Sequence, residues 1–192
     1  MGKARMEAFT DGVLAIIITI MVLEMKIPHG SELSSLKPLF PVLISYVLSF
    51  IYLGIYWNNH HHLMHAVKHI NGRVLWSNLH LLFWLSLIPF VTGWMGENNF
   101  DTIPVGLYGI VMLMCAFAYY ILLHSLTTLH GKDALITRAV GNDRKGKMSI
   151  VLYFGGIIFS FIHPYFGLLL YIIVAGIWFI PDQRFEKKEY TA

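Results

Sequence analysis

Residues 5–24 read Arg5-Met-Glu-Ala-Phe9-Thr10-Asp11-Gly-Val-Leu-Ala-Ile16-Ile-Ile-Thr19-Ile20-Met-Val-Leu23-Glu24, and the rest of the chain is interpreted around this stretch. Between positions 12 and 23 it carries no charge and only one hydroxyl group, that of Thr19. At the helical period of about 3.6 residues, one face collects Gly12, Ile16, Thr19, Ile20 and Leu23. This face is uncharged and follows the acidic Asp11 at the base of the helix, which predicts a membrane helix that lines a pore. An apolar stripe with this spacing is also typical of a helix that faces lipid or a protein core, and the residues alone leave that alternative open.

The composition predicts a membrane protein. Hydrophobic residues make up 56% of the 192 residues and charged residues 13%, whereas a soluble domain has about 25% charged residues. A transmembrane helix needs about 20 apolar residues. We expect one all-α domain over residues 1–192, with six transmembrane helices in the lipid bilayer and the first of them lining a central pore in an oligomer. The expected spans are residues 8–25, 38–58, 74–96, 103–129, 148–162 and 166–180.

The distribution of basic residues predicts the orientation in the membrane. With six spans and a cytoplasmic N-terminus, 12 of the 14 lysines and arginines fall on the cytoplasmic side. The two on the outer side are Lys26 and Lys37. Because cytoplasmic loops are enriched in Lys and Arg, we expect a multi-pass protein of the cell membrane with both termini in the cytoplasm. The cytoplasmic set is Lys3, Arg5, Lys68, Arg73, Lys132, Arg138, Arg144, Lys145, Lys147, Arg184, Lys187 and Lys188.

Nucleic-acid binding and a disulfide within the chain find no support. Nucleic-acid binding would need a Lys/Arg-rich stripe with interleaved aromatic residues, and none is present. Cys115, the single cysteine, lies in an apolar run and is expected to be a small packing residue.

Polar residues cluster at the cytoplasmic end of the first three predicted helices. Asp11 lies inside the apolar boundary, where an ionisable group is costly and usually paired. The end of the second segment and the start of the third lie at the same level by topology. We therefore expect a hydrogen-bonded network that holds the first helix in place, the alternative being separate, solvated interfacial residues. Its expected members are Arg5, Thr10, Asp11, His60, His61, Trp76, Asn78 and His80, with Trp57 at the same level.

The histidine-rich tract at residues 60–69 raises a metal hypothesis. His61, His65 and His69 recur at i, i+4 and i+8, a spacing compatible with ligation on one helix face. Membrane oxidases and desaturases that bind two iron ions need several such histidine boxes. This chain has one tract, with no Glu beside it. We expect no bound metal and no cofactor. A histidine interface for packing or pH sensing is the favoured interpretation.

Several motifs resemble those of one family. Arg5-x-x-x-Phe9-Thr10-Asp11 followed by Gly-Val-Leu-Ala-Ile is similar to the signature of the transmembrane protein 175 family, with Thr10 where the family has Ser. The resemblance continues in Trp57-Asn-Asn-His60-His61-His62-Leu, in Trp76-Ser-Asn78-Leu79 and in Ile88-Pro89-Phe90-Val-Thr92. It covers the first half of the chain by motif and the second half by hydropathy and length.

The resemblance implies a potassium-permeable channel with six helices per repeat. Single-repeat prokaryotic members of the family are homotetramers, and the first helix of each subunit lines the axis. The family's constriction carries over onto Ile16, and the layers above it onto Thr19, Ile20 and Leu23. Arg5, Phe9, Thr10 and Asp11 carry over as a structural network, with the histidine and asparagine groups of the next two helices as partners.

The sequence itself is consistent with a channel of this kind. No Thr-Val-Gly-Tyr-Gly filter is present, so an apolar constriction that gates by dewetting, with Thr19 as the direct ion contact, is expected in its place. We expect a channel for monovalent cations, potassium the permeant ion, and not an enzyme. The alternatives are a histidine-dependent membrane metalloenzyme and a small ion transporter.

Overall fold

Helices account for all the regular structure in the part of the chain that the computed structural model describes, residues 2–134, 136–137, 141 and 143–179. The elements are α1 (Lys3–Leu23), the 3-10 helix η1 (Leu33–Leu39), α2 (Phe40–His65), α3 (Gly72–Leu85), α4 (Ile88–Glu97), α5 (Thr102–His130), α7 (Arg144–Ser160) and α8 (Pro164–Phe179). Four stretches are long and apolar enough to cross a membrane: Lys3–Leu23, Leu33–His65, Gly72–Glu97 and Thr102–His130. The all-α membrane class is confirmed, and the count of six spans stays a prediction.

The third apolar segment is a broken helix. Hydropathy predicts one span over residues 74–96, but α3 ends at Leu85 and α4 begins at Ile88. Pro89 explains the break, because its ring nitrogen has no hydrogen to donate to the carbonyl of Leu85 four residues earlier. The two halves remain one apolar stretch of 26 residues.

Side-chain caps fix three of the helix starts. Asn71 Oδ1 accepts a hydrogen bond from Val74 N at the start of α3, 3.0 Å away. Asp101 Oδ1 accepts one from Thr102 N at the start of α5, and Asp143 Oδ1 one from Gly146 N at the start of α7. Each cap satisfies a backbone donor that the first turn leaves unpaired.

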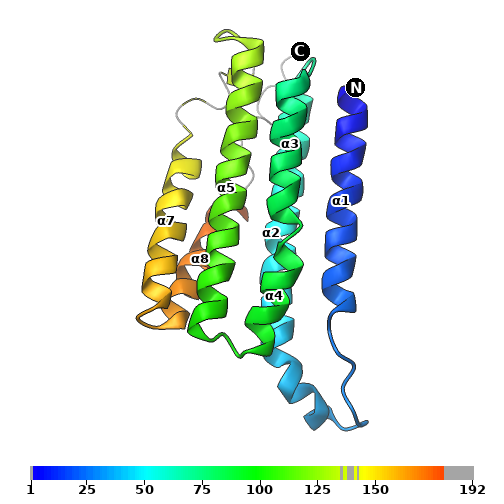
Figure 1. The fold of residues 1–192 in the computed structure, drawn as a ribbon, viewed down its shortest axis with the longest axis vertical. Coiled ribbons are helices and arrows are strands. Elements are labelled where there is room, and N and C mark those ends of the chain that lie inside the picture. Colours follow the sequence, from blue (N-terminus) through cyan, green and yellow to red (C-terminus); the bar gives the residue numbers. More distant parts are fainter. Residues whose placement is uncertain (1, 135, 138–140, 142, 180–192) are drawn as a thin grey trace.

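With α3 and α4 counted as one stretch, the long helices alternate in direction, so their ends gather in two groups (Figure 1). Lys3 Nζ donates to Val67 O at 2.9 Å, and the rings of His69 and His130 lie 4.7 Å apart, which places the start of α1 beside the ends of α2 and α5. At the opposite end, Lys26 pairs with Glu97 at 2.7 Å. Arg138, Arg184, Lys187 and Lys188, four of the basic residues used to predict the orientation, lie outside the described residues, as does Ile180 at the end of the last expected span.

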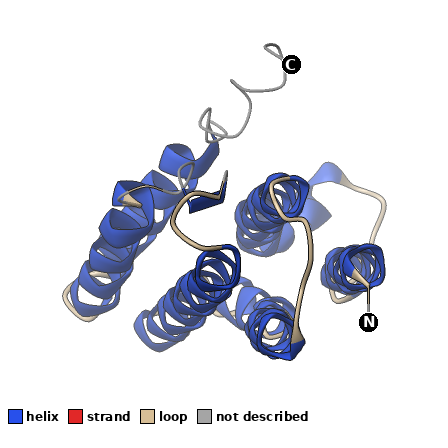
Figure 2. Cartoon of the chain, turned by 90° about the horizontal axis from the view of Figure 1, so that it is seen from above, coloured by secondary structure: helices blue, strands red, loops and turns tan. Residues whose placement is uncertain are grey.

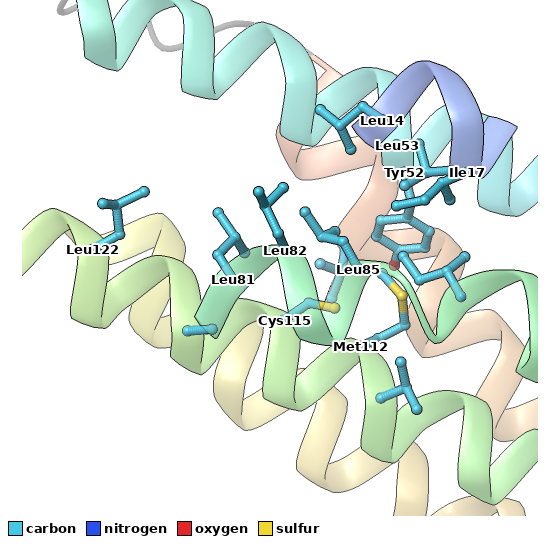
Figure 3. Close-up of a cluster of buried hydrophobic side chains, with 14 of the residues drawn as sticks. Leu14, Ile17, Tyr52, Leu53, Leu81, Leu82, Leu85, Met112, Cys115 and Leu122 are labelled. Atoms are coloured by element: carbon cyan, nitrogen blue, oxygen red, sulfur yellow. The ribbon is translucent and has the colours of Figure 1, made fainter. Parts of the chain in front are cut away.

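The core is built mainly on α5, and α1 lies at one edge of the bundle (Figures 1 and 2). Leu14 and Ile17 of α1 pack toward Leu53 of α2 and Leu82 and Leu85 of α3 (Figure 3). Cys115 is a free, fully buried thiol in this core, as expected for a packing residue. The edge position leaves α1 covered by its own chain on one side only.

Four buried tyrosines connect α2, α5, α7 and α8. Tyr52, Tyr108, Tyr153 and Tyr171 are each at most 2% exposed, and their rings contact one another. Tyr52 Oη donates to the carbonyl of Tyr171. These contacts join α2 to α5, α7 and α8 through one cluster of aromatic rings, and these three helices form a frame that holds α2.

Candidate ion pathway

The two faces of α1 have different surroundings although both are apolar. Met6, Thr10, Leu14, Ile17 and Met21 form the buried stripe that faces α2, α3 and α4. The opposite stripe is uncovered by the rest of the chain and contains all four residues expected to line the pathway. Ile16 is 58% exposed, Ile20 40% and Leu23 81%, and Thr19 is exposed between them.

This uncovered stripe is uncharged from Gly12 to Leu23, and Glu24 follows at its far end. Branched side chains of this kind project into whatever fills the space beside α1. If α1 faces lipid, these are ordinary lipid-facing side chains. If copies of α1 surround a symmetry axis, the same side chains form successive narrow rings. The geometry of one chain admits both surroundings, as the residue pattern does.

Thr19 is the only hydroxyl on the stripe, and its hydrogen is already used. Thr19 Oγ1 donates to the carbonyl of Ile16 at 2.8 Å. A helical threonine commonly makes a bond of this type. Because the hydroxyl hydrogen points back to the helix, the oxygen lone pairs remain available to an approaching cation.

A buried chain of hydrogen bonds fixes the base of α1. Thr10 Oγ1 donates to Met6 O at 3.0 Å and accepts from Asn78 Nδ2 of α3 at 2.9 Å. The other end of the Asn78 amide, Oδ1, lies 3.0 Å from His60 Nε2 of α2. All three residues are at most 2% exposed. The structure therefore joins α1, α2 and α3 through Thr10, Asn78 and His60, three of the expected network residues.

Asp11 has a separate partner. Its Oδ1 accepts a hydrogen bond from Trp57 Nε1 of α2 at 3.0 Å, and this hydrogen bond is exposed. The Trp57 ring stacks on His61 one turn later, with centroids 5.9 Å apart and an interplanar angle of 16°. Trp57 is one of the groups that topology predicts at the level of Asp11, and its hydrogen bond confirms that position.

The remaining expected residues lie apart from this network. Arg5 and Phe9 are exposed on the side of α1 that carries Ile16, and Arg5 makes no ion pair within the described residues. Trp76 is 75% exposed. His80 accepts a hydrogen bond from Trp84 Nε1 within α3, at 3.0 Å.

The histidine tract differs from its expected geometry. Because α2 ends at His65, His69 does not continue the helical face of His61 and His65, and its ring instead contacts His130. The interpretation of three histidines on one face is therefore wrong. The structure also brings a carboxylate to the tract, since Glu7 of α1 lies 3.6 Å from His61. Sequence reasoning missed Glu7 because it is far from the tract along the chain.

An exposed ion pair lies just beyond the other end of α1. Lys26 Nζ lies 2.7 Å from Glu97 Oε1 at the end of α4. The hydrogen bond to this carboxylate, together with its charge, raises the pKa of Lys26. Between this pair and the buried network, an open groove of about 920 Å³ separates α1 from α4 and the start of α2.

An all-α membrane bundle whose first helix is anchored at its base and carries an uncharged, uncovered stripe has the features of a subunit of an oligomeric membrane channel. Comparison with known proteins gives the same class. Residues 5–89 match the family of the endosomal/lysosomal potassium channel TMEM175. A potassium channel of Chryseobacterium sp. (strain P1-3) is 52% identical over 187 residues, which cover 97% of each chain. The chain therefore belongs to the TMEM175 family, and it is a channel protein rather than an enzyme.

More distant relatives extend this match. A potassium channel of Streptomyces collinus is 32% identical over 133 residues, which cover 65% of each chain. The crystal structure of a lysosomal potassium-selective channel TMEM175 homolog from Chamaesiphon minutus superposes with a TM-score of 0.80 at 27% identity, covering 94% of this chain and 97% of that one. The chicken endosomal/lysosomal proton channel TMEM175 is 26% identical over 150 residues, which are 70% of this chain and 30% of that protein.

Proposed function

We propose that the chain forms a potassium-permeable cation channel whose pore is lined by α1 of each subunit. The observation that carries this proposal is the uncovered, uncharged stripe of α1, which lies opposite its buried stripe and contains Ile16, Thr19, Ile20 and Leu23. One α1 helix cannot enclose a water-filled path. Symmetry-related copies supply the other walls, and closed point-group symmetry is the usual arrangement of such assemblies.

The assembly is a homotetramer. The family resemblance of the first half of the chain supports this number, and the exposed Arg5 and Phe9 at the base of α1 are free to contact a neighbouring subunit. The same proposal places both termini in the cytoplasm. The gathering of Lys3, Lys68 and Arg144 at one end of the bundle supports that orientation, because cytoplasmic loops favour Lys and Arg.

The constriction is a ring of Ile16 side chains. A narrow apolar ring excludes water, so a closed pore needs no charged gate. Above it, a ring of Thr19 oxygens offers a permeating ion the only side-chain dipoles of the stripe. Because the stripe carries no acidic ring, discrimination between potassium and sodium rests on these weak dipoles and is modest.

The variant Ile16→Asn tests the constriction. An amide of similar length hydrates the ring, so potassium flux into liposomes is expected to rise several-fold at equal protein density. Ile16→Leu is the matched control, since it keeps the ring apolar and its flux should stay near that of the unmodified channel. Equal flux in Ile16→Asn and the unmodified protein would show that the narrow point lies elsewhere.

A further inference from the structure

We propose that Glu7, His61 and His65 form a binding site for a divalent transition-metal ion, with Zn²⁺ as its simplest occupant. Glu7 comes from the first turns of α1, and the two histidines come from the last turn and a half of α2. Each residue offers one ligand atom, and the three atoms lie within 4.8 Å of one another. The site joins the proposed pore-lining helix to its neighbour.

The two histidines already have the spacing of metal ligands. His61 Nε2 and His65 Nε2 lie 3.1 Å apart. Bonds of about 2.0–2.1 Å at tetrahedral angles give an edge of about 3.3–3.4 Å between ligand atoms, so these two nitrogens need to separate by only a few tenths of an ångström. Glu7 lies on the Nδ1 side of His61 and has to turn toward the two Nε2 atoms to become the third ligand. Residues at i and i+4 on a helix share a face, which is why α2 holds both rings on the same side.

Neighbouring contacts orient this pair before any ion arrives. The His61 ring stacks on Trp57, and Trp57 donates to Asp11 on α1. The His61 and His65 rings lie edge to face, with centroids 4.4 Å apart. A ligand held by packing loses little freedom on binding, and supporting contacts of this kind commonly strengthen metal sites.

Glu7 supplies the negative charge and the third ligand. Its carboxylate lies 3.6 Å from His61 Nδ1 and its side chain is 25% exposed, so it faces the pair rather than open solvent. Two imidazoles and one carboxylate suit Zn²⁺ and similar borderline ions, whereas Mg²⁺ and Ca²⁺ prefer oxygen ligands alone. Three protein ligands leave the fourth position to water, as in an exchangeable site. His65 is exposed, which gives the ion an entry path.

Binding would add a link between α1 and α2 on the side of the Asp11–Trp57 hydrogen bond. A ligand that binds only the folded state raises its stability. The expected result of zinc addition is therefore a higher melting temperature of the channel, independent of whether it conducts.

Calorimetric titration of ZnCl₂ into the chelator-treated, purified full-length channel tests the proposal. The expected stoichiometry is one Zn²⁺ per chain. Glu7→Gln and His65→Ala should each weaken the affinity about 10- to 100-fold or more, since even residues outside the ligand set of a metal site contribute that much. His65→Gln, which keeps the size and hydrogen bonding of the side chain, should behave like His65→Ala.

His69→Ala is the matched control. His69 is an exposed histidine of the same tract, but it contacts His130 and not the proposed site. Its removal should leave zinc affinity and the zinc-induced rise in melting temperature unchanged. The proposal is overturned if the unmodified channel takes up no Zn²⁺, if the Glu7 and His65 variants keep its affinity, or if His69→Ala weakens binding as much as they do.

Discussion

Two threonines of α1 occupy opposite environments. Thr10 is 1% exposed and has protein partners for both its hydrogen and its oxygen, so it is part of the anchor. Thr19 is exposed and has a partner only for its hydrogen among the described residues. The same residue type therefore serves structure at the base of the helix and remains open to an ion two and a half turns later.

Thr19→Ala is expected to reduce the preference for potassium over sodium, because it removes the only side-chain oxygen of the proposed lining. Reversal potentials under bi-ionic conditions measure this preference. Thr19→Ser keeps the hydroxyl and should retain most of the selectivity. Identical ratios in the alanine variant and the unmodified channel would remove Thr19 from the ion-contacting layer.

Asn78→Ala is expected to destabilise the protein by about 1–3 kcal/mol, the usual cost of leaving buried polar partners unsatisfied. Thr10 and His60 lose their shared partner in this variant. The melting temperature of the channel in detergent reports the loss. Asn98→Ala is the control, since Asn98 is exposed and bonds only to the carbonyl of Trp94 within the described chain. Equal melting temperatures for the two variants would contradict the anchoring role.

At the scale of helices, α5, α7 and α8 form the frame and α1 is mounted on it through α2, α3 and α4. The frame depends on two glycines. A Cβ atom at Gly109 of α5 or at Gly156 of α7 would collide with the Tyr171 ring of α8. These contacts let three helices approach closely, as small residues do in membrane bundles.

Gly156→Ala is expected to cost about 1–3 kcal/mol of stability, since overpacking displaces the Tyr171 ring and its hydrogen bonds. The neighbouring Gly155 offers a matched control. A Cβ atom there would lie 3.7 Å from Leu170, an ordinary contact, so Gly155→Ala should be nearly neutral. Thermal unfolding of both variants in detergent separates them, and a Gly156→Ala variant as stable as Gly155→Ala would argue against the close approach.

The sequence predicted the helices better than their ends. Hydropathy placed the first two spans at residues 8–25 and 38–58, whereas α1 begins at Lys3 and α2 continues to His65. The polar run at the end of α2 remains helical because its side chains find partners: Asn59 Nδ2 donates to Ile55 O, and His60 bonds Asn78. Apolar boundaries mark where lipid is expected and not where helical hydrogen bonds end.

The contacts between helices were harder to predict than the helices. Periodicity separated the two faces of α1, and topology brought Thr10, His60 and Asn78 to one level. Neither fixes how each helix is rotated about its axis. That rotation decides that Asp11 meets Trp57 and that Glu7 reaches the histidine pair.

At the scale of the whole molecule, one chain is an incomplete pathway. The stripe of α1 is uncovered and an open groove runs beside it. The fourfold assembly proposed here would cover the stripe of α1 and leave α7 at the periphery. A thiol introduced on α1 and one introduced on α7 are therefore expected to respond differently to an aqueous reagent.

Potassium current through Thr19→Cys, before and after a small, positively charged methanethiosulfonate, tests this placement most directly. The native thiol, Cys115, is fully buried, so the introduced thiol is the reactive one. The reagent is expected to reduce the current of Thr19→Cys and to leave the unmodified channel and Val151→Cys, exposed on α7, unaffected. An unchanged current after complete modification of Thr19→Cys, verified by mass spectrometry, would show that α1 does not line the pore.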